Sequence, residues 1–186
     1  MPKKIDGFGL QFNVSQLLKE TTGADRHYEI NTMALDVLDE HTEVLTPLVG
    51  YIRFLRTGAD ILVTGTLDTT IQKECGRCLD LFVAPITIEL EEQFYPTIDV
   101  NTGLPLPPPD EADEANRINE QHILDLWEVV RQAATLEAES VRYCKPDCKG
   151  ICLQCGQNLN EATCDCQTDT VDLRWAGLLE KLNADE

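Results

Sequence analysis

Eight cysteines are the residues of this chain whose type and spacing most directly imply a chemistry. Two of them form the motif Cys75-Gly-Arg-Cys78. The other six lie together further along the chain: Cys144, Cys148, Cys152, Cys155, Cys164 and Cys166. A pair of cysteines separated by two residues can bind one tetrahedral metal ion, because a tight turn directs both sulfurs to the same side. The pattern therefore predicts a metal-binding protein.

Eight cysteines make two sets of four, of which spacing indicates only the first and the second consists of the four cysteines that remain. The first set, site 1, is local, because a loop of eight residues can bring both of its pairs around one ion: Cys152, Cys155, Cys164 and Cys166. The second set, site 2, requires the Cys75–Cys78 turn to lie beside the end of a helix expected over 120–140: Cys75, Cys78, Cys144 and Cys148. Two alternatives stay open. In the first, site 1 alone binds metal and the other cysteines are free or buried; in the second, Cys144 or Cys148 replaces a member of site 1.

Zinc, as one or two ions, is the metal that these residues favour. Four thiolates close a tetrahedral shell, which is typical of a structural rather than a catalytic zinc site. Iron is the rival, since tetrahedral sulfur sites suit it as well. A thioredoxin-like redox pair at Cys75 and Cys78 is a weaker alternative, because such a pair begins a helix and strands are expected on both sides here. No signal peptide is readable, so we expect a cytoplasmic protein whose thiols stay reduced.

Hydrophobic periodicity predicts the elements that must position these cysteines. A helix is expected over residues 12–20, and strands over 49–55, 60–75 and 82–94. On the strand 60–75, the alternation places Cys75 on the apolar face, so the Cys75–Cys78 motif falls in the turn between two antiparallel strands. A Pro-rich acidic loop follows. Further helices are expected from about Glu120, with apolar residues through Ala134, and from Asp172.

These elements predict an α+β fold in three parts. Residues 1–95 form a mainly antiparallel β domain that carries the Cys75–Cys78 motif. Residues 96–118 form the acidic Pro-rich loop, whose prolines and like charges disfavour a packed element. Residues 119–186 form a helical segment with a zinc knuckle (144–166) and a C-terminal helix. No phosphate loop, nucleophile motif or dinucleotide fingerprint occurs, so neither an enzyme nor a small-molecule substrate is expected.

The charge of the chain constrains its partners. The net charge is −18, and residues 89–140 hold thirteen acids against two arginines, whereas residues 51–80 and 141–167 are each neutral. The sequence contains no apolar run of about 20 residues, so no membrane span is predicted. An acidic chain repels nucleic acids at long range, so DNA is not expected as a partner, and RNA contact requires a local basic patch. The candidates are Arg53, Arg56, Lys73, Arg77, Arg142, Lys145 and Lys149.

The same charge favours a basic protein partner. An acidic surface increases the rate at which a basic protein associates with it, and the flexible loop in residues 89–140 suits that role. Each candidate cation has a simpler interpretation, in which it only balances neighbouring acids. Purification with and without nuclease distinguishes a protein partner from RNA, because only RNA binding is lost with nuclease.

The two cysteine motifs, in this order, resemble the YceD family, the large ribosomal RNA accumulation proteins. The resemblance rests on Cys75-Gly-Arg-Cys78-Leu79, on the run from Cys144 through Cys148-Lys-Gly-Ile-Cys152-Leu-Gln-Cys155-Gly156 to Asn160, and on Cys164-Asp-Cys166. Arg53, the Arg56-Thr57-Gly58 turn and Glu91-Glu92-Gln93-Phe94 fit it as well, so it covers nearly the whole chain.

The resemblance implies a non-enzymatic cytoplasmic factor that supports large-subunit ribosomal RNA accumulation and ribosome assembly. Zinc then stabilises the protein, and a basic ribosomal protein is the expected partner. Direct contact with large-subunit ribosomal RNA or its precursor is the first alternative. A small iron or redox protein that uses the cysteine pairs is the second alternative.

Overall fold

The computed structural model describes residues 3–6, 9–109 and 113–166. The chain divides into two compact units, which are described separately. The first comprises residues 1–75 and 80–144, and the second comprises residues 76–79 and 145–186. The helix that follows the acidic loop therefore belongs to the same unit as the strands. The expected domain boundaries at residues 95 and 118 stay a prediction.

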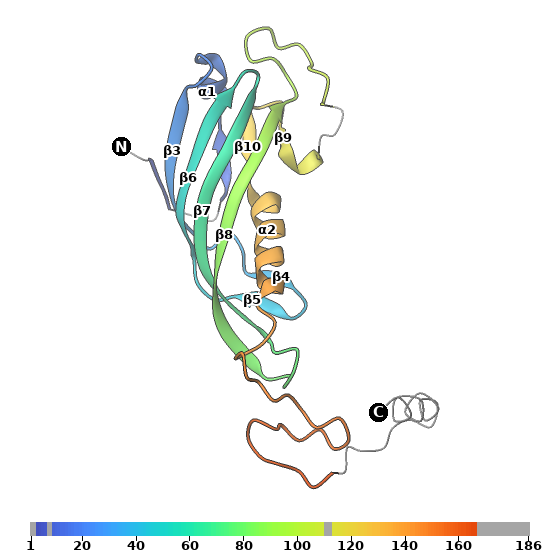
Figure 1. The fold of residues 1–186 in the computed structure, drawn as a ribbon. Coiled ribbons are helices and arrows are strands. Elements are labelled where there is room, and N and C mark those ends of the chain that lie inside the picture. Colours follow the sequence, from blue (N-terminus) through green and yellow to red (C-terminus); the bar gives the residue numbers. More distant parts are fainter. Residues whose placement is uncertain (1–2, 7–8, 110–112, 167–186) are drawn as a thin grey trace, which may run out of the picture. The chain divides into compact units, whose positions relative to one another are not determined.

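The first unit is built on a mostly antiparallel sheet (Figure 1). Four long strands, each antiparallel to its neighbour, form its main part in the order β3 (Asp25–Thr32), β6 (Leu48–Thr57), β7 (Asp60–Glu74) and β8 (Leu81–Pro96). Four short strands extend this sheet: β1 (Lys3–Asp6) along β3, β5 (Thr42–Val44) beside β7, β4 (Val37–Asp39) beside β5, and β9 (Arg117–Ile118) at the end of β8. A separate pair is formed by β2 (Gln11–Asn13) and β10 (Ile123–Asp125). The helices are α1 (Ser15–Lys19), the 3-10 turn η1 (Glu114–Asn116) and α2 (Trp127–Ser140). The α+β prediction is confirmed at this level.

Strand β7 has the alternation that the sequence predicts. Four apolar side chains on its inward face are fully buried: Ile61, Val63, Leu67 and Ile71. Cys75 continues this face at the end of the strand and is also fully buried. Its backbone N–H donates to the Asp80 carbonyl over 2.9 Å, which closes the turn into β8. The Cys75–Cys78 motif thus lies between two antiparallel strands, as predicted.

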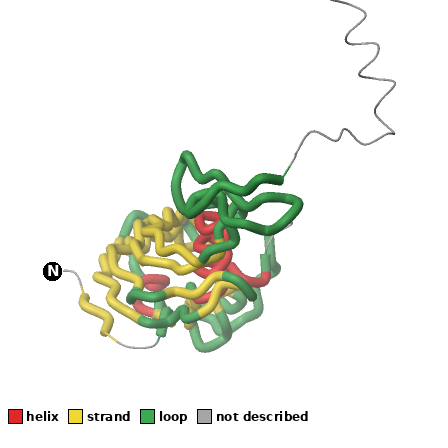
Figure 2. Tube along the Cα trace, turned by 90° about the horizontal axis from the view of Figure 1, so that it is seen from below, coloured by secondary structure: helices red, strands yellow, loops and turns green. Residues whose placement is uncertain are grey.

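One face of the sheet packs against α2, and Figure 2 shows the strands gathered on one side of that helix. The buried face of α2 presents Val130, Ala134 and Ala138, each fully buried. At the other end of the core, the Phe12 ring lies 4.9 Å from the rings of both Tyr28 and Phe54. The small alanines let the helix lie close to the strands, and the aromatic rings of the core pack edge-on against one another.

The helix expected from Glu120 begins instead at Trp127. Residues Ile123–Asp125 pair with β2, and the Asp125 carboxylate accepts the Trp127 N–H over 2.8 Å at the start of the helix. His122, which the helix prediction placed on its exposed first turn, is half-buried in a turn with φ 56°. The N-terminal helix is also shorter than predicted, because residues 11–13 belong to β2.

The acidic loop contains more local structure than its composition predicts. Ile98 and Pro105 form an isolated bridge, and Asp99 closes a turn by accepting the backbone N–H of Thr102 over 2.7 Å. Asp113 begins η1, and β9 follows. The end of the predicted loop thus contains a 3-10 turn, and a short strand follows it. The helix expected from Asp172 lies outside the described residues.

Strand β8 has one edge paired with β7 along most of its length. Among the described residues, its other edge pairs only at Tyr95 and Pro96, with β9. In the part of the chain that the structure describes, no helix has the length and apolar character needed to cross a membrane.

Candidate metal centres

The four sulfurs of site 1 converge within the second unit. The Sγ atoms of Cys152, Cys155, Cys164 and Cys166 all lie within 4.8 Å of one another. Four thiolates around one zinc ion, each about 2.3 Å from it, have sulfurs about 3.8 Å apart. The described positions therefore need only small adjustments to hold such an ion, and the donor set fits zinc.

Backbone contacts of the Cys152–Cys155 turn explain how site 1 forms. The N–H of Gly156 donates to the Cys152 carbonyl over 2.8 Å, and the N–H of Cys152 donates to the Gln157 carbonyl over 2.8 Å. Gly156 has φ 74°, a conformation that costs glycine little because it has no Cβ. The glycine after the second cysteine therefore allows the chain to turn back sharply.

The same turn gives two cysteines of site 1 opposite tendencies to ionise. Backbone N–H groups of Cys155 and Gln154 lower the pKa of Cys152 to about 6, because they stabilise its thiolate. The neighbouring Cys155 side chain, together with burial, raises the pKa of Cys166 to about 12. Amides that stabilise one anionic sulfur are also what a metal-bound thiolate requires. The turn therefore favours the thiolate form of Cys152, which is the form that binds metal.

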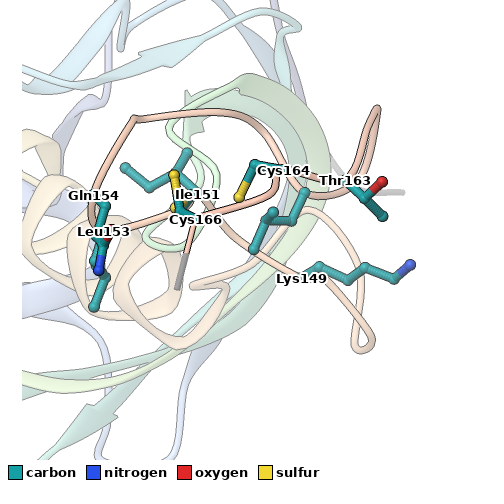
Figure 3. A pocket seen from close by; sticks show the side chains of 9 residues that line it. Lys149, Ile151, Leu153, Gln154, Thr163, Cys164 and Cys166 are labelled. Atoms are coloured by element: carbon teal, nitrogen blue, oxygen red, sulfur yellow. The ribbon is translucent and has the colours of Figure 1, made fainter. Parts of the chain in front are cut away.

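A cavity of about 760 Å³ lies beside site 1 (Figure 3). Cys164 and Cys166 line it together with apolar side chains that include Ile151 and Leu159. Leu153, between the first two ligands, is 96 % exposed. The cysteine group thus opens onto an apolar surface rather than being enclosed by the chain.

The sulfurs of site 2 form a second convergent group. Cys75, Cys78, Cys144 and Cys148 have Sγ atoms within 4.8 Å of one another. The backbone N–H of Cys144 donates to the Cys75 sulfur over 3.4 Å. The amide of Asn160 donates to the Cys148 sulfur over 3.3 Å. The two groups contain the same cysteines as the two sets expected from the sequence, and both could hold a metal ion.

Arg77 organises the backbone around Cys148. Its guanidinium donates to the carbonyls of Pro146, over 3.3 Å, and Cys148, over 3.1 Å. Its own carbonyl accepts the Ile151 N–H over 3.1 Å. A Cβ at Gly150 would lie 3.0 Å from that carbonyl oxygen, so the close approach favours glycine there. Arg77 therefore has a structural role in addition to the partner contact predicted for it.

Four other candidate cations also contact groups of the chain. Arg53 donates to Asp25 over 3.1 Å, Arg56 to the Gly58 carbonyl over 2.9 Å, and Arg142 to the Glu139 carbonyl over 3.3 Å. Lys73 is the most buried of the seven, with a side chain 10 % exposed. Its ammonium donates to the Ala138 carbonyl over 2.7 Å and lies 3.6 Å from Glu139. Lys145 and Lys149 are exposed.

The structure does not bring all seven cations together. Arg53 lies on the face of β6 opposite to its buried residues, whereas Lys73 lies on the buried face of β7. Arg53 pairs with Thr64, which is nine residues from Lys73 along β7, or about 30 Å at the usual rise of a strand. These two cations therefore cannot belong to one compact RNA-binding patch.

The contacts of two supporting residues had no clear signal in the sequence. Lys73 lies at an inward position of β7, which the strand's alternation indicates, but its helix-end partner depends on tertiary packing. Asn160 lies in a polar loop, and nothing in its spacing indicates a contact with a cysteine.

Comparison with known proteins gives consistent results. A family profile described as "Large ribosomal RNA subunit accumulation protein YceD" matches residues 63–182. Uncharacterized proteins of Mycobacterium bovis and Mycobacterium tuberculosis are 34% identical over 123 residues, which is 66% of this chain and 56% of theirs. The chain thus spans about half the length of these curated relatives. No solved structure matches the chain significantly.

A plant protein also matches, over a shorter stretch. It is described as "Large ribosomal RNA subunit accumulation protein YCED homolog 1, chloroplastic", from Arabidopsis thaliana. It is 39% identical over 49 residues, which is 26% of this chain and 15% of that protein. The family profile, in contrast, covers well over half of the chain and includes all eight cysteines. The chain therefore belongs to the YceD family.

Proposed function

We propose that this protein is a zinc-stabilised, non-enzymatic factor that supports large-subunit ribosomal RNA accumulation by binding a basic ribosomal protein. The family description supports the process, which is the accumulation of large-subunit ribosomal RNA. The charge of the chain supports the kind of partner. With a net charge of −18, its surface attracts basic proteins and repels RNA at long range.

The arrangement of charges carries this proposal. Five of the seven candidate cations donate to groups of the chain, as described above. On the face of the sheet turned away from α2, Glu29 and Glu89 lie in one row across four strands, with Tyr51 and Thr66 between them. Asp68 and Glu91 lie on the same face. A basic surface laid across these strands would meet several carboxylates and few competing cations.

Zinc has a structural role in this proposal. The residues that would hold it are Cys152, Cys155, Cys164 and Cys166 at site 1, and Cys75, Cys78, Cys144 and Cys148 at site 2. A closed shell of thiolates stabilises a segment that has little apolar core of its own. The described part of the second unit has that character, because Leu153 is exposed and both Ile151 and Leu159 are only half-buried.

Metal content tests the cofactor. We expect two zinc ions per chain by elemental analysis of the natively purified protein. Cys164→Ser and Cys75→Ser should each remove one ion, and Thr163→Ala, next to a ligand, should retain both. Protein that is colourless and contains no iron excludes the iron alternative. Retention of both ions in either cysteine variant would contradict the corresponding ligand set.

The partner is tested by crosslinking the tagged protein in growing cells and purifying it with and without nuclease. We expect one basic ribosomal protein under both conditions. Replacing Glu29 and Glu89 by glutamine should reduce its recovery, whereas Glu161→Gln, in the second unit, serves as a matched control. Recovery of large-subunit RNA fragments that nuclease removes would instead support direct RNA contact. The exposed Lys145 and Lys149 favour that second candidate.

A further inference from the structure

We propose that Asn160 couples the two cysteine groups, so that metal binding at site 1 strengthens metal binding at site 2. This inference rests on the proposed metal-binding role of both groups. Asn160 lies in the loop between Cys155 and Cys164, which are ligands of site 1, yet its side chain contacts Cys148, a ligand of site 2. It acts as a positioning residue for a sulfur that belongs to the other site.

The two polar atoms of the Asn160 side chain contact Cys148 and the residue that follows it. Its Nδ2 donates to the Cys148 sulfur over 3.3 Å, and its Oδ1 accepts the backbone N–H of Lys149 over 3.0 Å. The sulfur and the following peptide are therefore fixed by one planar group. Because an amide has a donor and an acceptor in fixed relative positions, a small displacement of Asn160 weakens both contacts.

The conformation of the loop fixes Asn160 in turn. Its backbone N–H and its Nδ2 lie 2.9 Å and 3.0 Å from Asn158 Oδ1. The Asn158 carbonyl accepts the N–H groups of Glu161 and Ala162, each over 3.2 Å. The Leu159 N–H donates to the Gly150 carbonyl over 2.9 Å. These contacts form a compact turn, and Asn160 is held at its centre.

Metal at site 1 would anchor both ends of this loop, since Cys155 precedes it and Cys164 follows it. Closing a loop reduces the number of conformations that it can adopt, so the turn around Asn158 forms more often. The Asn160 amide is then in position to stabilise the Cys148 thiolate. Groups that bond to a metal ligand in this way typically change metal affinity about 10- to 100-fold. By thermodynamic linkage, metal at site 2 strengthens metal binding at site 1 by the same factor by which metal at site 1 strengthens metal binding at site 2.

A double-mutant cycle tests the coupling. Zinc affinity at site 2 is measured by competition with a chelator in four full-length proteins: the original chain, Asn160→Ala, Cys164→Ser/Cys166→Ser, and the combined variant. We expect Asn160→Ala to weaken site 2 about 10- to 100-fold. The double serine variant, which lacks site 1, should weaken site 2 similarly. The combined variant should be no weaker than either, because both changes remove the same support.

Two further variants separate the bond to sulfur from a general effect on the loop. Asn160→Asp keeps the acceptor for the Lys149 N–H but replaces the donor with a carboxylate beside the thiolate, so it should weaken site 2 at least as much as alanine. Thr163→Ala alters the same loop without removing a contact to Cys148, and its site 2 affinity should be unchanged. In the cadmium-loaded protein, Asn160→Ala should shift the cadmium NMR signal of site 2 and leave that of site 1 in place.

The possible results discriminate clearly. Additive losses in the cycle, or an unchanged site 2 affinity and cadmium signal in Asn160→Ala, would overturn the coupling while leaving the metal sites intact. The cadmium comparison needs no site 1 deletion, so it tests the contact between Asn160 and Cys148, on which the coupling depends, even when the double serine variant does not fold. Absence of metal binding at both groups would overturn the proposed zinc role together with the coupling.

Discussion

Replacing Lys73 by methionine tests how the first unit holds its long helix. The Lys73 side chain is 10 % exposed, and its ammonium donates to the Ala138 carbonyl over 2.7 Å. Ala138 lies in the last turn of α2, where carbonyls lack helical partners and the helix dipole favours a cation. Methionine keeps most of the apolar volume of lysine but provides no donor.

The expected loss follows from these contacts. A hydrogen bond to a charged group contributes roughly 1.5–3 kcal/mol, and a cation at a helix C-terminus about 0.3–1 kcal/mol. Methionine removes both but avoids burying an ammonium, which offsets part of the loss. Glu139 loses little, because its side chain is 62% exposed. We therefore expect a net loss of about 2 kcal/mol, a roughly 30-fold lower folding equilibrium constant.

Urea unfolding followed by Trp127 fluorescence measures this loss. Trp127 lies in α2, and its Nε1 donates to the Ala34 carbonyl over 3.0 Å, so its emission reports on the packing of this helix. The assay uses a Trp175→Phe background, which leaves one tryptophan. The matched control is Lys19→Met, at an exposed position of α1, which should change stability by less than about 0.5 kcal/mol. If Lys73→Met is as stable as the original chain, burial of the ammonium costs as much as its bonds contribute, and the reasoning fails.

Two further predictions concern a strand and a thiol. Gly50→Ala should destabilise the first unit by more than about 3 kcal/mol in the same urea assay, because a Cβ there would overlap the Thr66 backbone carbonyl oxygen. Gly9→Ala, where nothing lies within 4 Å of the added Cβ, is the control, and equal stabilities would contradict the described pairing of β6 and β7. In the metal-free protein, thiolate ultraviolet absorbance should show a step near pH 6 that Cys152→Ser removes, since backbone amides lower the pKa of Cys152 to about 6. Because the pKa of Cys152 is lower in the folded protein, its ionisation stabilises the fold at pH values above the ordinary thiol pKa. This contribution is lost as the pH falls through about 6. If the absorbance step occurs only near the ordinary thiol pKa of about 8.5, the lowered pKa of Cys152 is refuted.

Local patterns predicted the parts of the fold that depend on local interactions. The alternation along β7 correctly indicated its buried face and the place of Cys75, because strand periodicity is visible within a few residues. The short spacing from Cys152 to Cys166 also predicted the group of sulfurs now described as site 1. That either group binds metal, and which metal, stays a prediction.

Long-range contacts limited what the sequence could reveal. Ile123, Leu126 and Trp127 have helical spacing, yet Ile123 lies in a strand because β2, far away in the sequence, pairs with residues 123–125. The positive φ of His122 is equally hard to foresee, since this conformation is uncommon outside glycine. The contact between Asn160 and Cys148 depends on the tertiary course of a polar loop and has no signature in residue spacing.

Over the residues that the structure describes, the outer edge of β8 pairs only at Tyr95 and Pro96, which has a consequence for self-association. Exposed strand edges can pair with other chains and cause aggregation, and proteins oppose this with prolines and charges. Strand β8 contains Pro85, which has no backbone N–H to donate, and Glu89, Glu91 and Glu92 follow it along the strand. Their carboxylates would repel a second copy of the same edge, so we expect part of the acidity of this protein to oppose self-association. Any variant that neutralises these glutamates should therefore also be measured by light scattering, since aggregation of the protein would reduce recovery of a partner in the same way as a loss of binding.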